Sequence, residues 1–158
     1  MKDRNILAGD DWRTPPEFYK KLNNKFNFDF DPCPWRHDLT LWDGLKDGWG
    51  SVNFINPPYS LKLKTAFVQK AYRTSSVAKN VLLLPVSTST KLFHLYLIDA
   101  KITFVKGRLR FIGVNAKGQR VNFDQLQETT KETILFEGKE IPKFINNSGM
   151  FDSMVIEL

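Results

Sequence analysis

The chain has 158 residues, of which 42% are hydrophobic and 25% charged, as in a folded globular domain rather than a disordered chain. Its single cysteine, Cys33, excludes an internal disulfide and a zinc site built mainly from cysteines, and with only His37 and His94 as histidines we expect no metal. No apolar run approaches the ~18 residues of a membrane span, and the first residues lack a secretory pattern. We therefore expect a cytoplasmic protein with one domain, residues 1–158.

Positive charge is concentrated in the middle of the chain. Residues 60–123 contain 12 lysines and arginines against one acidic residue, Asp99, whereas the segments on either side are net acidic. A cationic segment attracts a polyanion. A solvated lysine-rich helix is the alternative explanation, and the charge alone favours neither.

The first predicted element is a helix over residues 12–25. Thr14 suits the N-cap and Pro15 the first helical position, and Glu17 follows three residues after Thr14 as in a capping box. Apolar side chains then recur at helical spacing.

Two short strands and a second helix follow. Residues 28–31 alternate apolar and acidic side chains, residues 52–55 form a second strand, and each strand runs into prolines that end it. Residues 61–73 place their apolar side chains on one face, which predicts a helix.

The second half of the chain continues the alternation. We predict a buried strand over 80–86, a short helix over 90–98, and strands over 102–105, 109–112 and 150–157. Strands that alternate with helices indicate an α/β sheet with helices on its faces. Ligands of such sheets bind beyond the carboxyl ends of the strands, where Asp31 and Asn56 would lie.

The most informative residues form a turn after the second strand: Asn56, Pro57, Pro58 and Tyr59. Two consecutive prolines fix φ and remove two N–H donors, so the strand end presents carbonyl acceptors, to which Asn56 adds its amide oxygen. Converging acceptors would hold both hydrogens of a planar NH2 group and localise the nitrogen lone pair for attack on a methyl group. Tyr59 offers a ring for stacking. A proline-rich turn with a packed Tyr59 is the structural alternative.

Several segments carry a family resemblance through their order and spacing. They are Asp11-Trp12-Arg13-Thr14-Pro15, Phe28-Asp29-Phe30-Asp31-Pro32-Cys33, Asp43-Gly44-Leu45, Trp49, Asn56-Pro57-Pro58-Tyr59-Ser60, Leu84-Pro85, Gly107-Arg108-Leu109-Arg110-Phe111 and Ser153-Met154-Val155. Together they resemble the small phage-type DNA N6-adenine methyltransferases of the Dam type, which use S-adenosylmethionine. The resemblance implies a compact Rossmann-like class I methyltransferase sheet. It also implies methyl transfer to the exocyclic amine of an adenine flipped out of duplex DNA.

The same resemblance implies a cofactor site. Its residues would be Trp12, Thr14, Pro15, Asp31, Pro32, Cys33 and Asp43. Trp12 would cover the cofactor, Thr14 would lie beside its methionine end, and Asp31 would bind through its carboxylate. Each has a structural alternative: a helix cap for Thr14, a turn aspartate for Asp31, and a surface turn for Asp43, with Asp38 as another candidate for the adenosine contact. The chain has Pro34 and Trp35 where methyltransferases of this general fold usually have a glycine-rich turn.

Duplex DNA is the partner that the resemblance implies. In that context Lys62, Lys64, Arg108 and Arg110 are predicted to contact phosphates, along with Lys70 and other cations of the middle segment. Arg108 and Arg110 would point the same way on a strand. Residues 114–149 would hold the target-recognition element, an interpretation by exclusion.

Two other functions stay open. A protein-glutamine methyltransferase would present the same planar amide to the same turn, and a degenerate DNA-binding relative could have lost its cofactor. Protection of phage DNA from host restriction is implied by the family alone.

Overall fold

The computed structural model is a mixed α/β fold in which residues 12–34, 38–114, 120–122, 133–136, 139–142 and 151–158 are described. Its helices are α1 (Pro16–Phe26), α2 (Leu61–Thr74) and the short π-helix η1 (Phe93–Leu97). The main sheet contains β1 (Val52–Ile55), β2 (Lys79–Pro85), β3 (Lys101–Phe104) and β8 (Ser153–Glu157). Two further pairs are β4 (Ile112–Val114) with β5 (Arg120–Asn122), and β6 (Thr133–Phe136) with β7 (Lys139–Pro142).

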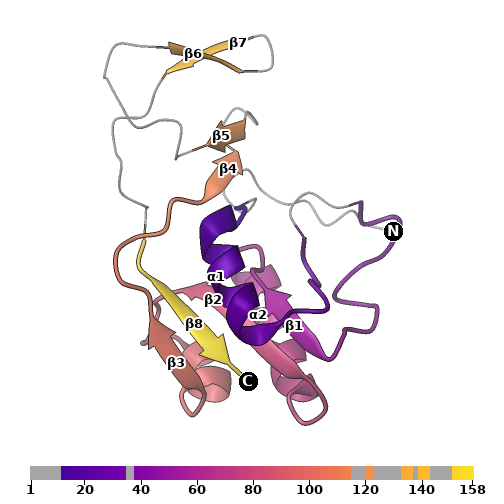
Figure 1. Ribbon diagram of the computed structural model, residues 1–158. Helices are drawn as coiled ribbons and strands as arrows, with labels where there is room; N and C mark the ends of the chain where they lie inside the picture. Colours follow the sequence, from indigo (N-terminus) through magenta and orange to yellow (C-terminus); the bar gives the residue numbers. More distant parts are fainter. Residues whose placement is uncertain (1–11, 35–37, 115–119, 123–132, 137–138, 143–150) are drawn as a thin grey trace.

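The main sheet has the strand order β1-β2-β8-β3. β1 and β2 are parallel, and β8 is antiparallel to both β2 and β3 (Figure 1). A single parallel bridge joins Phe30 to Asn53, so the segment that ends at Asp31 runs beside β1. The carboxyl ends of this segment, β1, β2 and β3 therefore open at one edge of the sheet, which we call the site edge.

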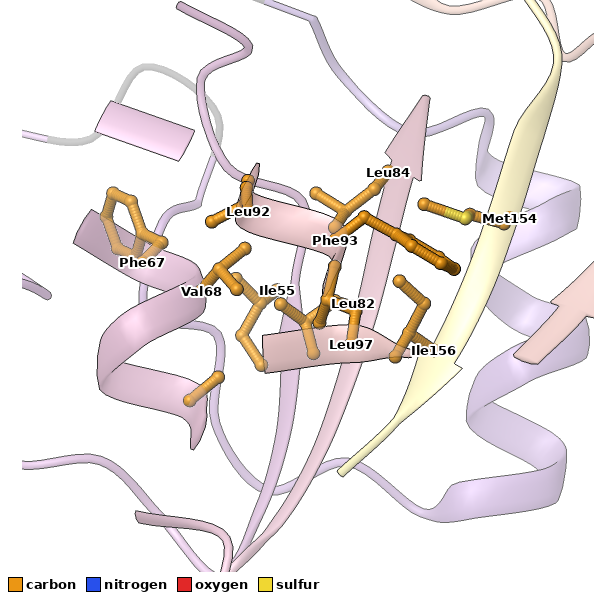
Figure 2. Close-up of a cluster of buried hydrophobic side chains, with 11 residues drawn as sticks. Ile55, Phe67, Val68, Leu82, Leu84, Leu92, Phe93, Leu97, Met154 and Ile156 are labelled. Carbon is orange, nitrogen blue, oxygen red and sulfur yellow. The ribbon is translucent and has the colours of Figure 1, made fainter. Parts of the chain in front are cut away.

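Helices cover both faces of the sheet, as the sequence predicts. On one face α2 and η1 pack against β2 and β8 through residues such as Phe67, Leu82 and Ile156 (Figure 2). On the other face α1 packs through Leu22 against a cluster that includes Leu83. Because side chains alternate along a strand, the continuous apolar run of β2 supplies both cores.

The edge opposite the site edge is closed by ion pairs. Glu157, at the end of β8, forms ion pairs with Lys79 at 3.1 Å, Lys101 at 3.4 Å and Lys25 at 3.7 Å. The three lysines come from β2, β3 and α1. One mostly buried carboxylate thus joins the first helix to the base of the sheet.

The helix α2 and the strands β1, β2, β3 and β8 are confirmed within one to three residues at their ends. The expected helix over 12–25 starts later, at Pro16. Its N-cap residue is Pro15, and no side chain caps it, so the predicted capping box at Thr14 is wrong. The side chain of Thr14 is instead bonded to a neighbouring loop, as described below.

Three other expectations need correction. Residues 28–31 make one bridge rather than a strand of their own. The helix over 90–98 is a short α-helical start followed by the π-helix η1. The strand over 109–112 is absent, because Gly107, at φ +75°, turns the chain and Phe111 packs into the α1-side core. Strand pairing begins only at Ile112.

Candidate active site

Asn56 stands where β1 leaves the sheet, and its side-chain amide is held from three directions. The Nδ2 group donates to the backbone oxygen of Trp12 at 2.8 Å and to Oγ1 of Thr14 at 3.1 Å. The Oδ1 atom accepts from the hydroxyl of Tyr59 at 2.7 Å. These partners fix which end of the amide is oxygen, and they leave Oδ1 one further lone pair for a donor.

Tyr59 connects this amide to a group of aromatic rings. Its hydroxyl also lies 3.3 Å from the backbone oxygen of Leu83. Its ring meets Phe111 and Phe151 edge-on, with centroids 6.1 and 5.4 Å away. Burial, and to a lesser degree the nearby Cys33, raises the pKa of Tyr59 well above its ordinary value, so the hydroxyl keeps its proton and stays a donor.

A cavity of about 220 Å³ opens beside Asn56 at the site edge. It is lined by Trp12, Arg13, Thr14, Pro16, Tyr19, Asp31, Cys33, Phe54 and Asn56. The structure thus brings together five residues that the sequence assigned to catalysis or cofactor binding, from three separate segments. The segments meet because residues 28–31 and β1 run parallel, while the chain before α1 is bonded to Asn56.

Asp31 is the acidic group of this cavity. Its Oδ1 accepts from the backbone N–H of Cys33 at 2.9 Å, which shapes the turn around Pro32. Burial raises the pKa of Asp31 to about 6, against the lowering effect of the Cys33 amide. The cavity therefore presents a desolvated carboxylate that a cationic ligand would stabilise.

The other predicted cofactor residues lie near the cavity without lining it. Pro15 precedes α1, and Pro32 is buried with its carbonyl against Gly44. The carboxylate of Asp43 is buried and accepts from the backbone N–H of Leu45 at 2.9 Å, which stabilises a turn. An adenosine contact from Asp43 stays a prediction.

Comparison with known families decides the kind of protein. A family described as DNA N-6-adenine-methyltransferase (Dam) matches residues 4–140, which is most of the chain. The chain belongs to this family. Membership confirms the Dam-type resemblance and implies a DNA methyltransferase, with DNA as substrate and a methyl donor. No curated protein and no solved structure matches the chain.

The cations that a Dam-family enzyme would turn toward DNA have varied surroundings here. Lys62 is exposed, whereas Lys64 and Arg110 are half-buried. Nε of Arg108 donates to Asp152 at 3.0 Å. Arg108 and Arg110 do not share a strand face, because residues 107–111 form no strand. Their phosphate contacts stay a prediction.

Lys70 has a place that the charge pattern did not indicate. Its ammonium group donates to the backbone oxygens of Gly44 and Asp47. These bonds give Lys70 a structural place instead of the predicted phosphate contact. For the proposed target-recognition element, the described residues give the pairs β4 with β5 and β6 with β7. Most of 114–149 lies outside the described residues.

A metal site and a membrane span are both absent from the described residues. In the described part of the chain, no group of three or more His, Cys, Asp or Glu side chains could hold a metal ion. Within those same residues, no helix is long and apolar enough to cross a membrane.

Sequence reasoning missed four residues of the cavity: Arg13, Pro16, Tyr19 and Phe54. A signal existed for Arg13, which stands between two residues assigned to the cofactor. Pro16 and Tyr19 are three apart on α1 and so share a helix face, which could have marked them.

Proposed function

We propose that this Dam-family chain is an S-adenosylmethionine-dependent methyltransferase that modifies N6 of an adenine flipped out of double-stranded DNA. The observation that carries the proposal is the position of Asn56. Asn56 lines a cavity with an acidic wall, and its amide oxygen accepts from Tyr59, whose ring belongs to a group of aromatic rings. A methyl donor on one side and a base on the other would meet at this oxygen.

The charges of the residues that line the cavity are complementary to those of the cofactor. S-adenosylmethionine supplies an electrophilic methyl group on a sulfonium and carries an ammonium and a carboxylate. Asp31 would bind the ammonium, which relieves the penalty of its own burial. Arg13, which also lines the cavity, has the charge that suits the carboxylate, and Trp12 would cover the bound molecule. Thr14, Pro15, Pro32, Cys33 and Asp43 complete the proposed set.

For catalysis, Asn56 accepts one hydrogen of the adenine amine through the lone pair of Oδ1 that Tyr59 leaves unused. The backbone carbonyl of Pro57 accepts the other hydrogen, because Pro57 and Pro58 keep the strand end free of N–H donors. Held this way, the amine nitrogen has a localised lone pair. The bound cofactor would supply the methyl group and keep the electrons of the carbon–sulfur bond as a thioether, and the methylated amine would lose one proton to water.

The rings of Tyr59, Phe111 and Phe151 are proposed to receive the flipped base. Their edge-to-face contacts are worth about 0.5–1.5 kcal/mol each, so the rings would have to separate to admit a purine, whose stacking would replace contacts of similar strength. Lys62, Lys64, Arg108 and Arg110 would contact phosphates on either side of the flipped base. Residues 114–149 would recognise the target within a single domain, residues 1–158, built on a Rossmann-like sheet.

The test is DNA methylation in cells that lack other adenine methylation. Sequencing that detects N6-methyladenine should find it at one recurrent site with the wild-type chain and nowhere with Asn56→Ala. Purified chain should also incorporate labelled methyl groups into DNA. Incorporation into protein glutamine instead would replace the proposal by the glutamine alternative, and failure to bind the cofactor in calorimetry would indicate an inactive DNA-binding relative.

A further inference from the structure

A loop between Asp43 and Trp49 lies between the helix α2 and the turn that carries Asp31. Its backbone touches that turn at Gly44. A Cβ atom at Gly44 would lie 1.8 Å from the backbone oxygen of Pro32, a distance no side chain could occupy. The absence of a side chain at Gly44 therefore lets the loop support the Asp31 turn by direct backbone contact.

The ammonium group of Lys70 binds the other side of this loop. It donates to the backbone oxygen of Gly44 at 3.0 Å and also to that of Asp47. The indole N–H of Trp49 donates to the same oxygen of Gly44 at 2.6 Å, and the ammonium lies 5.2 Å from the Trp49 ring centre. The backbone oxygen of Gly44 thus accepts from two side chains, while the Cα atom of Gly44 packs against the backbone of Pro32.

The surroundings of Lys70 are those of a structural amine rather than a DNA contact. Desolvation lowers its pKa, against the raising effects of Asp47 and Asp43, and Arg73 adds a smaller lowering effect. Two of its three N–H donors are used on carbonyl groups. An approaching phosphate would have to compete with both bonds.

We propose that Lys70 is a positioning residue for the cofactor, acting through Gly44 and Pro32 on the turn that places Asp31 and Cys33 in the cavity. The inference rests on the proposed function of that cavity. Because α2 begins at Leu61, two residues after Tyr59, one helix would then follow the catalytic turn at its start and support the cofactor turn from its third turn. The two halves of the site would keep their spacing through this helix.

The test compares Lys70→Met and Lys70→Arg with Lys20→Met, which removes an exposed lysine of α1. S-adenosylmethionine binding is measured by calorimetry, and methyl transfer is measured with each substrate varied. By analogy with residues that orient metal ligands, Lys70→Met should weaken cofactor binding about 10-fold or more. The KM for the cofactor should rise, whereas kcat at saturating cofactor, the KM for DNA and the salt dependence of DNA binding should stay near wild type.

Lys70→Arg should recover most of the affinity, because a guanidinium can also donate to two carbonyls, and Lys20→Met should match the wild type. If Lys70→Met does not fold by circular dichroism, Lys70→Gln takes its place and should show an intermediate loss. A folded Lys70→Met or Lys70→Gln variant with wild-type cofactor affinity would overturn the inference, as would a loss confined to DNA binding. A wild-type chain that binds no cofactor would overturn the proposed function itself.

Discussion

Replacing Asp31 by Asn should make the protein more stable and less able to bind its cofactor. The buried carboxylate has a pKa of about 6, against 3.8 for an unperturbed aspartate. At about 1.4 kcal/mol per pKa unit, ionised Asp31 lowers the free energy of unfolding by about 3 kcal/mol at pH well above 6. Asn keeps the shape of the side chain and an oxygen that accepts from the Cys33 amide. It therefore removes the charge with little change to the turn.

The sign of the pH dependence follows from the direction of this shift. The folded state holds the proton of Asp31 more tightly than the unfolded chain does. This group therefore adds stability as the pH falls through 6 and toward 3.8. The affinity for the cofactor should instead fall as the pH falls. A bound ammonium favours the carboxylate, so affinity should fall by up to about tenfold per pH unit below 6.

The assay is urea unfolding, together with cofactor calorimetry, from pH 5 to 8 for wild type and Asp31→Asn. The variant should gain stability at pH 8, lose the pH dependence that Asp31 causes, and bind S-adenosylmethionine at least about 10-fold more weakly at every pH above 6. Cofactor affinity that is equal in the two proteins at pH 8 would refute the assignment of Asp31. Equal stability at pH 8 would refute the argument from burial.

Four further substitutions test the catalytic and DNA-binding residues. Asn56→Ala should remove about 3 kcal/mol of transition-state stabilisation, by analogy with oxyanion-hole donors, and leave cofactor affinity within a few fold. Single-turnover rates measure the loss of methyl transfer, and a wild-type rate would contradict the prediction. Tyr59→Phe should lower kcat more than the affinity for DNA, because it removes the bond that orients Oδ1 of Asn56 and a longer contact with Leu83 but keeps the ring; equal kcat would show that the hydroxyl does not orient Asn56. Arg110→Ala should flatten the slope of log K against log salt by about 0.9 on cognate and scrambled duplexes alike, whereas Arg108→Ala should change it less, since Asp152 already neutralises that cation. Fluorescence anisotropy across a salt series gives both slopes, and an unaltered slope for Arg110→Ala would remove it from the phosphate contacts.

The parts of the fold that the sequence predicted were those in which local pattern and tertiary packing agree. The apolar run of β2 and the one-sided pattern of α2 lead directly to a sheet covered on both faces. From parallel strands alone, Asp31 and Asn56 could be expected at one edge, and both line the same cavity.

What could not be predicted depends on contacts between distant segments. Thr14 has the sequence signature of an N-cap, yet its hydroxyl accepts from Asn56, which lies 42 residues further along the chain. Lys70 counts as one more cation in a basic segment until its carbonyl partners are seen. In both cases the residue type fits several uses, and only the folded chain selects one.

The place of β8 in the sheet has a consequence for how the enzyme is made. β8 lies between β2 and β3, although it follows every other strand of the sheet in sequence. During synthesis on a ribosome, β3 would therefore have no strand to pair with until residues 153–157 emerge. The three lysines that pair with Glu157 would also lack this partner until then. Contacts of such long sequence separation slow folding. Phe151 lies just before this strand and contacts Tyr59, so the ring group that we propose for the flipped base would be incomplete until synthesis has passed that point.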